Sequence, residues 1–203
     1  MTAIKHVVFD IGKVLIHYDP ERPFLHLIPD AEERRYFLAN ICTHDWNLEQ
    51  DRGRSWEEAE AVLIAEHPQH ESNIRGFRKY WHEMPFAAID ESVAMMRGLI
   101  ASGMDVTMLT NFASDTYRQA VEMYPFLNEP RGVTVSGDVK VIKPDREIYC
   151  IHTEGFGLEP AATLFIDDSA ANVKGAQDFG WQAVLFTGPE QLRADFGAYG
   201  LAV

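Results

Sequence analysis

Short apolar runs that stop abruptly at polar residues recur along the chain. Such runs are typical of strands buried on both faces, as in a parallel sheet covered by helices. The predicted strands are Ile4–Phe9, Val106–Leu109, Leu164–Ile166 and Ala183–Phe186. Helical patterns alternate with the later strands, at Glu91–Ala101, Asp115–Tyr124, Arg146–Gly155 and Ala170–Phe179. This alternation predicts an α/β fold with a doubly wound parallel sheet, in which ligands bind at the carboxyl ends of the strands.

One long segment breaks the alternation. Between the first strand and residue 86 the sequence favours helices, at Ala31–Ile41, Asp45–Gln50, Ser55–Glu66 and Ser72–His82. Ser55 and Glu58 have the spacing of a capping box at the start of the third of these helices. We therefore expect a helical module at residues 18–86, inserted into a core formed by residues 1–17 and 87–203.

The amino-acid composition excludes some classes of binding partner. The 203 residues include 31 acidic and 18 basic side chains, which gives a formal net charge of −13. Such a surface repels nucleic acid and anionic lipid, so we expect neither as a partner. The N-terminal apolar run is too short for a signal peptide, and no run is long enough to span a bilayer. With only two cysteines, whose spacing does not suggest a metal site, we expect free thiols and a cytoplasmic location.

Reactive side chains stand at the predicted strand ends. Asp10 follows the first strand, Thr110 and Asn111 follow the second, and Asp167 and Asp168 follow the third. Lys143 lies between the last two groups, directly before a proline that could open a helix. Carboxylates are the ligands that Mg²⁺ prefers, and a carboxylate can also attack phosphorus. Together these residues predict a site for a divalent cation and a phosphoryl group.

These motifs, taken in order, resemble the haloacid dehalogenase (HAD) superfamily over nearly the whole chain. The four matching segments are Phe9-Asp10-Ile11-Gly12-Lys13-Val14-Leu15, Leu109-Thr110-Asn111, Lys143-Pro144-Asp145 with Ile148-Tyr149, and Phe165-Ile166-Asp167-Asp168-Ser169 with Asn172, Gly175 and Ala176. The pattern is similar to subfamily IA, variant 3, and to its alpha-D-glucose-1-phosphate phosphatase branch. The resemblance implies a Rossmann-like core with a C1-type helical cap.

The resemblance also implies roles for the site residues. Asp10 would be the nucleophile and a magnesium ligand, and Lys143 would neutralise charge on Asp10 and on the transferring group. Thr110 and Asn111 would hold phosphoryl oxygens. Further metal ligands would be the Gly12 carbonyl, Asp168 directly, and Asp167 directly or through water. Asn172 would either orient the acidic pair or face solvent.

Gly12 departs from the usual phosphatase motif, which has a second aspartate two residues after the nucleophile as general acid and base. Loss of such a group costs about 10²–10⁴-fold in rate. Three outcomes are open: a substrate with a good leaving group, turnover that is slow, or replacement by a neighbouring side chain such as Lys13, His17 or Asp19. Glycine at this position also occurs in the glucose-1-phosphate phosphatase branch.

The sequence therefore predicts a magnesium-dependent phosphatase that acts on a small phosphorylated metabolite, with a sugar phosphate as one candidate, through an aspartyl-phosphate. Metal-independent 2-haloacid dehalogenation is the rival chemistry, because those relatives also lack the second aspartate. Their fourth motif, however, has serine and asparagine at the positions of Asp167 and Asp168. A non-catalytic module that binds a phosphometabolite or a protein is a third hypothesis. In the helical insert, Arg52 and Arg54 are the best candidates for substrate contact. We expect the chain to be a monomer or a homodimer.

Overall fold

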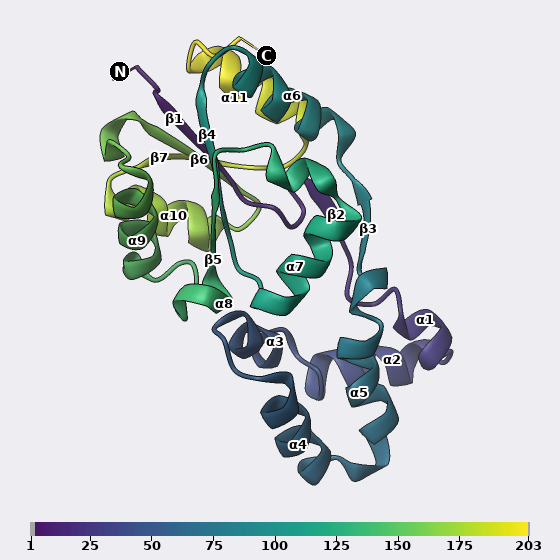
Figure 1. Cartoon of the computed structure of the whole chain (residues 1–203). Coiled ribbons are helices and arrows are strands. Elements are labelled where there is room, and N and C mark those ends of the chain that lie inside the picture. Colours follow the sequence, from purple (N-terminus) through teal and green to yellow (C-terminus); the bar gives the residue numbers. More distant parts are fainter. Residues whose placement is uncertain (1–2, 203) are drawn as a thin grey trace.

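A five-stranded parallel sheet forms the centre of the protein, in the strand order β5-β4-β1-β6-β7 (Figure 1). The computed structural model describes residues 3–202. The strands are β1 (His6–Phe9), β4 (Asp105–Thr110), β5 (Val133–Val135), β6 (Thr163–Asp167) and β7 (Gln182–Leu185). This sheet confirms the predicted α/β class. The edge strand β5 was not predicted, because three residues, one of them a threonine, are too short to give an apolar run.

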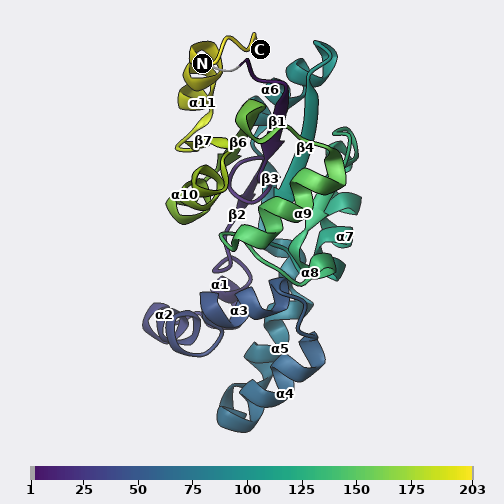
Figure 2. The same cartoon turned by 90° about the vertical axis from the view of Figure 1, so that its left-hand side faces the viewer.

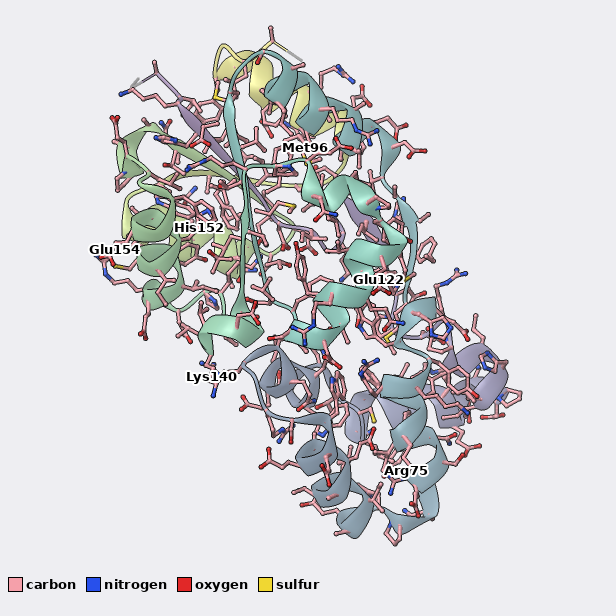
Figure 3. The ribbon with its side chains drawn as sticks, in the orientation of Figure 1. Arg75, Met96, Glu122, Lys140, His152 and Glu154 are labelled. Atoms are coloured by element: carbon pink, nitrogen blue, oxygen red, sulfur yellow. The ribbon has the colours of Figure 1, made fainter. Side chains whose placement is uncertain are left out.

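Helices cover both faces of the sheet, and α8 (Ser136–Val139) follows β5 (Figures 1 and 2). One face carries α6 (Asp90–Ala101), α7 (Ser114–Met123) and α11 (Pro189–Ala198), and the other carries α9 (Arg146–Phe156) and α10 (Ala170–Phe179). Successive strand residues point to opposite faces. In β1, Val7 and Phe9 therefore pack with the first group of helices, and Val8 packs with the second. His152 extends from α9 toward the sheet (Figure 3).

Residues 19–84 form a helical segment beyond the carboxyl edge of the sheet (Figures 1 and 2). It contains α1 (Phe24–Leu27), α2 (Ala31–Asn40), α3 (His44–Asp51), α4 (Trp56–Glu66) and α5 (Glu71–Lys79). The side chains of Asp30, Thr43 and Ser55 accept backbone N–H groups at the starts of α2, α3 and α4, which satisfies donors that a helix start leaves unpaired. The capping role predicted for Ser55 is confirmed, since its Oγ accepts from the Glu58 N–H at 3.2 Å.

A two-stranded antiparallel ribbon joins the helical segment to the core. It pairs β2 (Ile16–Tyr18) with β3 (Pro85–Ala88) and was not predicted from the sequence. The ribbon holds the two ends of the helical segment side by side, so both connections leave the core at one place. Four short 3₁₀ turns complete the fold, at Pro68–His70, Trp81–Glu83, Pro125–Asn128 and Pro160–Ala162. None of the helices within residues 3–202 combines the length and apolarity that a bilayer crossing requires.

Candidate active site

Strand register brings the predicted site residues to one edge of the sheet. Phe9 of β1 pairs with Met108 of β4 on one side and with Ile166 of β6 on the other. The next residue, Asp10, donates its backbone N–H to the Ile166 carbonyl at 2.9 Å. Because all three strands are parallel, the residues that follow them share the same edge. Residues separated by more than 150 positions in the chain thus become neighbours.

Lys143 lies at the centre of the charged groups. Its side chain is buried, and its Nζ is 2.7 Å from Asp10 Oδ1, 2.7 Å from Asp167 Oδ2 and 3.0 Å from the Leu109 carbonyl oxygen. An ammonium has three N–H donors, so these three contacts use all of them. Burial pulls the pKa of Lys143 down, but Asp10 and Asp167 outweigh it and hold the pKa above its ordinary value. Lys143 is therefore charged.

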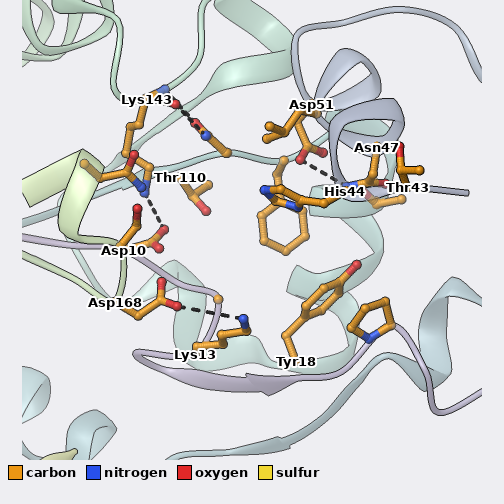
Figure 4. Close-up of a pocket in the computed structure, with 18 of the residues that line it drawn as sticks. Asp10, Lys13, Tyr18, Thr43, His44, Asn47, Asp51, Thr110, Lys143 and Asp168 are labelled. Atoms are coloured by element: carbon orange, nitrogen blue, oxygen red, sulfur yellow. Dashed lines mark hydrogen bonds and ion pairs between the residues drawn. The ribbon is translucent and has the colours of Figure 1, made fainter. Parts of the chain in front are cut away.

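Asn111 positions Lys143. Its amide Nδ2 donates to the Lys143 carbonyl at 3.0 Å, and its Oδ1 accepts the Lys143 backbone N–H at 2.8 Å. The Asn111 side chain thus fixes the backbone of Lys143. That Asn111 also holds a phosphoryl oxygen stays a prediction. Thr110 lines the cavity near Asp10, as predicted (Figure 4).

The two acidic residues after β6 differ in their surroundings. Asp167 is fully buried and accepts hydrogen bonds from Lys143, from the Ser169 N–H at 2.8 Å and from Asn172 Nδ2 at 3.0 and 3.1 Å. Asn172 therefore orients Asp167, the buried member of the acidic pair. Asp168 has a partly exposed side chain that lines the cavity, with Lys13 Nζ 4.0 Å away. Of the two, Asp168 has more oxygen capacity left for a further ligand.

Asp10, Asp167 and Asp168 form a cluster that fits a hard divalent cation. One oxygen from each carboxylate lies within 4.8 Å of the others. Burial raises the pKa of Asp10 to about 7 against the opposing charge of Lys143, and burial followed by Asp167 raises the pKa of Asp168. The buried ammonium of Lys143 and the more distant, exposed one of Lys13 do not balance three crowded carboxylates. A divalent cation would supply the missing positive charge, and oxygen ligands are those that Mg²⁺ prefers.

A cavity of about 610 Å³ separates these residues from the helical segment (Figure 4). Its core wall carries the charged groups and Gly12. Apolar side chains form much of the remaining lining, namely Leu38, Leu48, Trp56, Phe77, Trp81 and Phe112. Polar groups of the opposite wall are Thr43, His44, Asn47 and Asp51, with Tyr18 at the ribbon. Among the described lining residues, the only lysine or arginine side chains are Lys13 and Lys143, both on the core wall.

The candidates proposed for substrate contact in the helical segment lie elsewhere. Arg52 pairs with Asp145 of the core at 3.0 Å, and Arg54 donates to Gln50 Oε1 at 2.7 Å within the segment. The polar residues on the helical side of the cavity were missed instead. Asp51 and His44 belong to no recognisable motif, and which wall a helix presents to the cavity depends on tertiary packing. Their only local signal is a position near the ends of one predicted helix.

The three residues considered as replacements for the aspartate missing at position 12 lie in different surroundings. Lys13 lines the cavity. His17 stacks on Phe86, with ring centroids 5.3 Å apart, and Asp19 accepts the Glu21 N–H at 2.9 Å. A Cβ built on Gly12 would meet nothing within 4 Å, so the space that a second aspartate would occupy is open.

A family comparison identifies this class of site. The model of the haloacid dehalogenase-like hydrolases matches residues 4–180, which is most of the chain. The chain therefore belongs to the haloacid dehalogenase-like hydrolase family, and it is an enzyme of the hydrolase class.

Solved structures share the fold. A HAD family enzyme from Bacteroides thetaiotaomicron is 23% identical, with 96% of this chain and 99% of that one covered and a TM-score of 0.76. The same enzyme has been crystallised with magnesium and inorganic phosphate, and that structure is 22% identical over 92% of this chain and 96% of that one, with a TM-score of 0.72. An L-2-haloacid dehalogenase from Xanthobacter autotrophicus, with chloropropionic acid covalently bound, is 18% identical over 98% of this chain and 85% of that one, with a TM-score of 0.66. At these identities the likeness concerns the fold alone, and a shared fold does not imply a shared activity.

Proposed function

We propose that the protein is a magnesium-dependent phosphatase that hydrolyses a small phosphomonoester through an aspartyl-phosphate on Asp10. The observation that carries this proposal is the buried contact of Lys143 with Asp10 and Asp167, beside the partly exposed carboxylate of Asp168. A nucleophile, a fixed positive charge and a set of metal-ligand oxygens then share one edge of the cavity. Phosphoryl transfer needs these groups because its catalysis consists mainly of positioning and charge stabilisation.

In the first step an oxygen of Asp10 attacks phosphorus, and the bond between phosphorus and the leaving oxygen breaks. In the second step water attacks phosphorus, the bond to Asp10 breaks, and inorganic phosphate leaves. Lys143 acts through its charge, since its N–H groups already have partners, while Thr110 donates to a phosphoryl oxygen. Asp10, Asp168 and the Gly12 carbonyl, with Asp167 directly or through water, would hold a magnesium ion, which would supply Lewis-acid stabilisation of the phosphoryl oxygens.

The cavity favours a substrate with a single anionic group. Its lysine side chains lie on the core wall with the phosphoryl site, and its other wall offers aromatic faces, the polar side chains of Thr43, His44 and Asn47, and the carboxyl group of Asp51. A second phosphate or a carboxylate on the substrate would therefore have no lysine or arginine to bind. A sugar monophosphate fits these requirements, since aromatic rings pack on its C–H faces. The resemblance to subfamily IA, variant 3, and its glucose-1-phosphate phosphatase branch points to the same class.

The helical segment is proposed to act as a cap domain of residues 18–86 on a core of residues 1–17 and 87–203. The cavity lies between the two, so substrate would enter and product would leave when the cap moves on the β2–β3 ribbon. Closing such a cap excludes water and completes the binding site.

One experiment separates this proposal from 2-haloacid dehalogenation and from a non-catalytic role. Phosphate release from a panel of phosphomonoesters, and halide release from short 2-halo acids, are measured with Mg²⁺ and with a chelator. We expect phosphate release that needs Mg²⁺, with a loss of at least about 10³-fold in Asp10→Asn because the nucleophile is gone. Asp178→Asn is the matched control, since Asp178 is an exposed carboxylate of α10, far from the helical segment in the sequence, and it pairs with Lys174.

Halide release that survives the chelator, without phosphate release, would assign the protein to dehalogenation. Binding of Mg²⁺ and phosphate without turnover of any substrate in the panel would contradict both chemistries.

A further inference from the structure

Asp51 is a carboxylate in the cavity that the steps above leave unused. It is the last residue of α3 and lies across the cavity from Asp10 and Thr110 (Figure 4). In the described part of the chain no lysine, arginine or histidine forms an ion pair with it. Asp51 is half-buried, and a carboxylate that gives up part of its hydration without an ion pair costs stability, so its presence here calls for a functional reason.

The core, rather than the helical segment alone, fixes the position of Asp51. The backbone N–H of Ala113, in the loop that follows Thr110, acts on its carboxylate and lowers its pKa. Its backbone carbonyl accepts from Ser136 Oγ at 2.6 Å, and the same Oγ accepts the Phe112 N–H at 2.9 Å. Asn47 adds a longer contact of 3.3 Å to Asp51 Oδ2. Asp51 is thus held at a set place relative to the loop that carries Thr110.

Asp51 lies where the reaction needs a general acid. In an in-line displacement the leaving oxygen lies on the side of phosphorus opposite the nucleophile. Asp10 attacks from the core wall, so the leaving oxygen faces the helical wall, where Asp51 lies. The space at Gly12 that a second aspartate would fill is open.

We propose that Asp51 is the general acid and base of the reaction and takes over the function that the chain lacks at position 12. This inference rests on the proposed phosphatase activity. In the first step the protonated carboxyl of Asp51 gives its proton to the leaving oxygen while the bond from Asp10 to phosphorus forms. In the second step the carboxylate of Asp51 takes a proton from the attacking water, while the bond from phosphorus to Asp10 breaks. Each cycle returns Asp51 to its protonated form.

The electrostatic surroundings suit this cycle. Burial raises the pKa of Asp51 to about 7, against the opposing effects of the Ala113 N–H and of Lys143 and with a further rise from Asp10. Tyr18 faces Asp51 as well, and burial followed by the charge of Asp51 raises the pKa of that phenol. A pKa near the operating pH lets one group both donate and accept a proton.

The test varies the leaving group. Phenyl phosphate releases a phenolate that needs a proton, whereas 2,4-dinitrophenyl phosphate releases one that does not, and both rings suit the aromatic walls. kcat/KM is measured for both esters with Mg²⁺, because it reports the steps up to phosphoryl transfer to Asp10. In Asp51→Asn we expect a fall of about 10²–10⁴-fold for phenyl phosphate and of less than about tenfold for the dinitrophenyl ester.

Asp45→Asn is the matched control, because Asp45 is an exposed carboxylate on the same helix, and it should leave both values near wild type. Retained hydrolysis of the dinitrophenyl ester shows that Asp51→Asn is folded, and Asp51→Ser replaces it if the asparagine variant does not fold. Equal loss for the two esters, or no loss for either, would overturn the role of Asp51. A wild-type protein that hydrolyses neither ester would instead overturn the proposed phosphatase activity.

Discussion

At the scale of single residues, buried polar groups in this protein follow two different patterns. Lys143, Asp10 and Asp167 form a charged group at the cavity, whereas His152 lies in the core between β4 and β5 as a neutral ring. His152 contacts Thr107 Oγ1 through Nε2 at 2.9 Å and Thr134 Oγ1 through Nδ1 at 2.8 Å. Burial, with a smaller effect of Arg131, lowers the pKa of His152 from 6.5 to about 3.

This pKa predicts acid sensitivity of the fold. Above pH 6.5 the ring is neutral in both folded and unfolded states and contributes no pH dependence. Below pH 6.5 the unfolded state binds a proton that the folded state does not, so stability falls by about 1.4 kcal/mol per pH unit until about pH 3. His152→Gln keeps the hydrogen-bonding groups but cannot take up a proton. We expect urea unfolding to show that its stability relative to wild type rises by about 2 kcal/mol between pH 8 and pH 5. Parallel stability curves for the two proteins would contradict this.

At the scale of elements, the packing of α10 against the loop that carries Lys143 sets the geometry of the site. A Cβ on Gly175 of α10 would lie 2.9 Å from the Pro144 carbonyl oxygen and 3.1 Å from Tyr149 Oη. Glycine is therefore required here by close approach. The motif position of Gly175 in the sequence acquires a physical meaning only when the loop is seen beside it.

Gly175→Ala should displace this loop and with it Lys143. Overpacking of this kind typically costs about 1–3 kcal/mol, so we expect lower stability in urea unfolding together with a reduced kcat. Gly155→Ala in α9 is the control, because a Cβ there meets nothing within 4 Å. Since alanine favours a helix over glycine, the control should gain up to about 1 kcal/mol and retain full activity. A Gly175→Ala protein with unchanged stability and kcat would show that the loop adapts freely.

At the scale of the whole molecule, the helical segment meets the core through a few polar contacts around the cavity. Asp115 of α7 accepts from Arg78 of α5 at 2.6 and 2.8 Å and from Trp56 Nε1 of α4 at 3.2 Å. These contacts hold the arrangement in which both walls of the cavity are present. Partly exposed ion pairs contribute little to global stability, but they bias the balance between closed and open arrangements.

Asp115→Ala should therefore weaken substrate binding more than folding. A loss of about 1 kcal/mol in the closed arrangement raises KM by roughly threefold to tenfold, with a change in Tm of only a few degrees. Glu129→Ala is the matched control, because it removes the exposed Arg97–Glu129 pair, which lies outside the helical segment. Steady-state kinetics and thermal unfolding of both variants test this, and an unchanged KM for Asp115→Ala would mean that these contacts do not control closure.

The strand ends show which site residues can be predicted from the local order of apolar and polar residues. Asp10, Thr110, Asp167 and Lys143 could be selected from the sequence because each stands at a change from apolar to polar residues, and a parallel sheet brings such positions to one edge. The resemblance to the haloacid dehalogenase family in the sequence rests on the same motifs. The short strands β2, β3 and β5 could not be selected, since three or four residues give no periodicity, and their pairing depends on distant partners.

The α/β alternation, the helical insert and the charged residues at the sheet edge follow from the amino-acid sequence alone, because burial and strand length are reflected directly in the order of apolar and polar residues. Three other relations exist only in the folded protein: Asn111 holds the backbone of Lys143, Asn172 supports Asp167, and Asp51 faces Asp10 across the cavity. These relations join residues far apart in the chain, and the packing of α3 against the core loops, rather than any local preference, creates them.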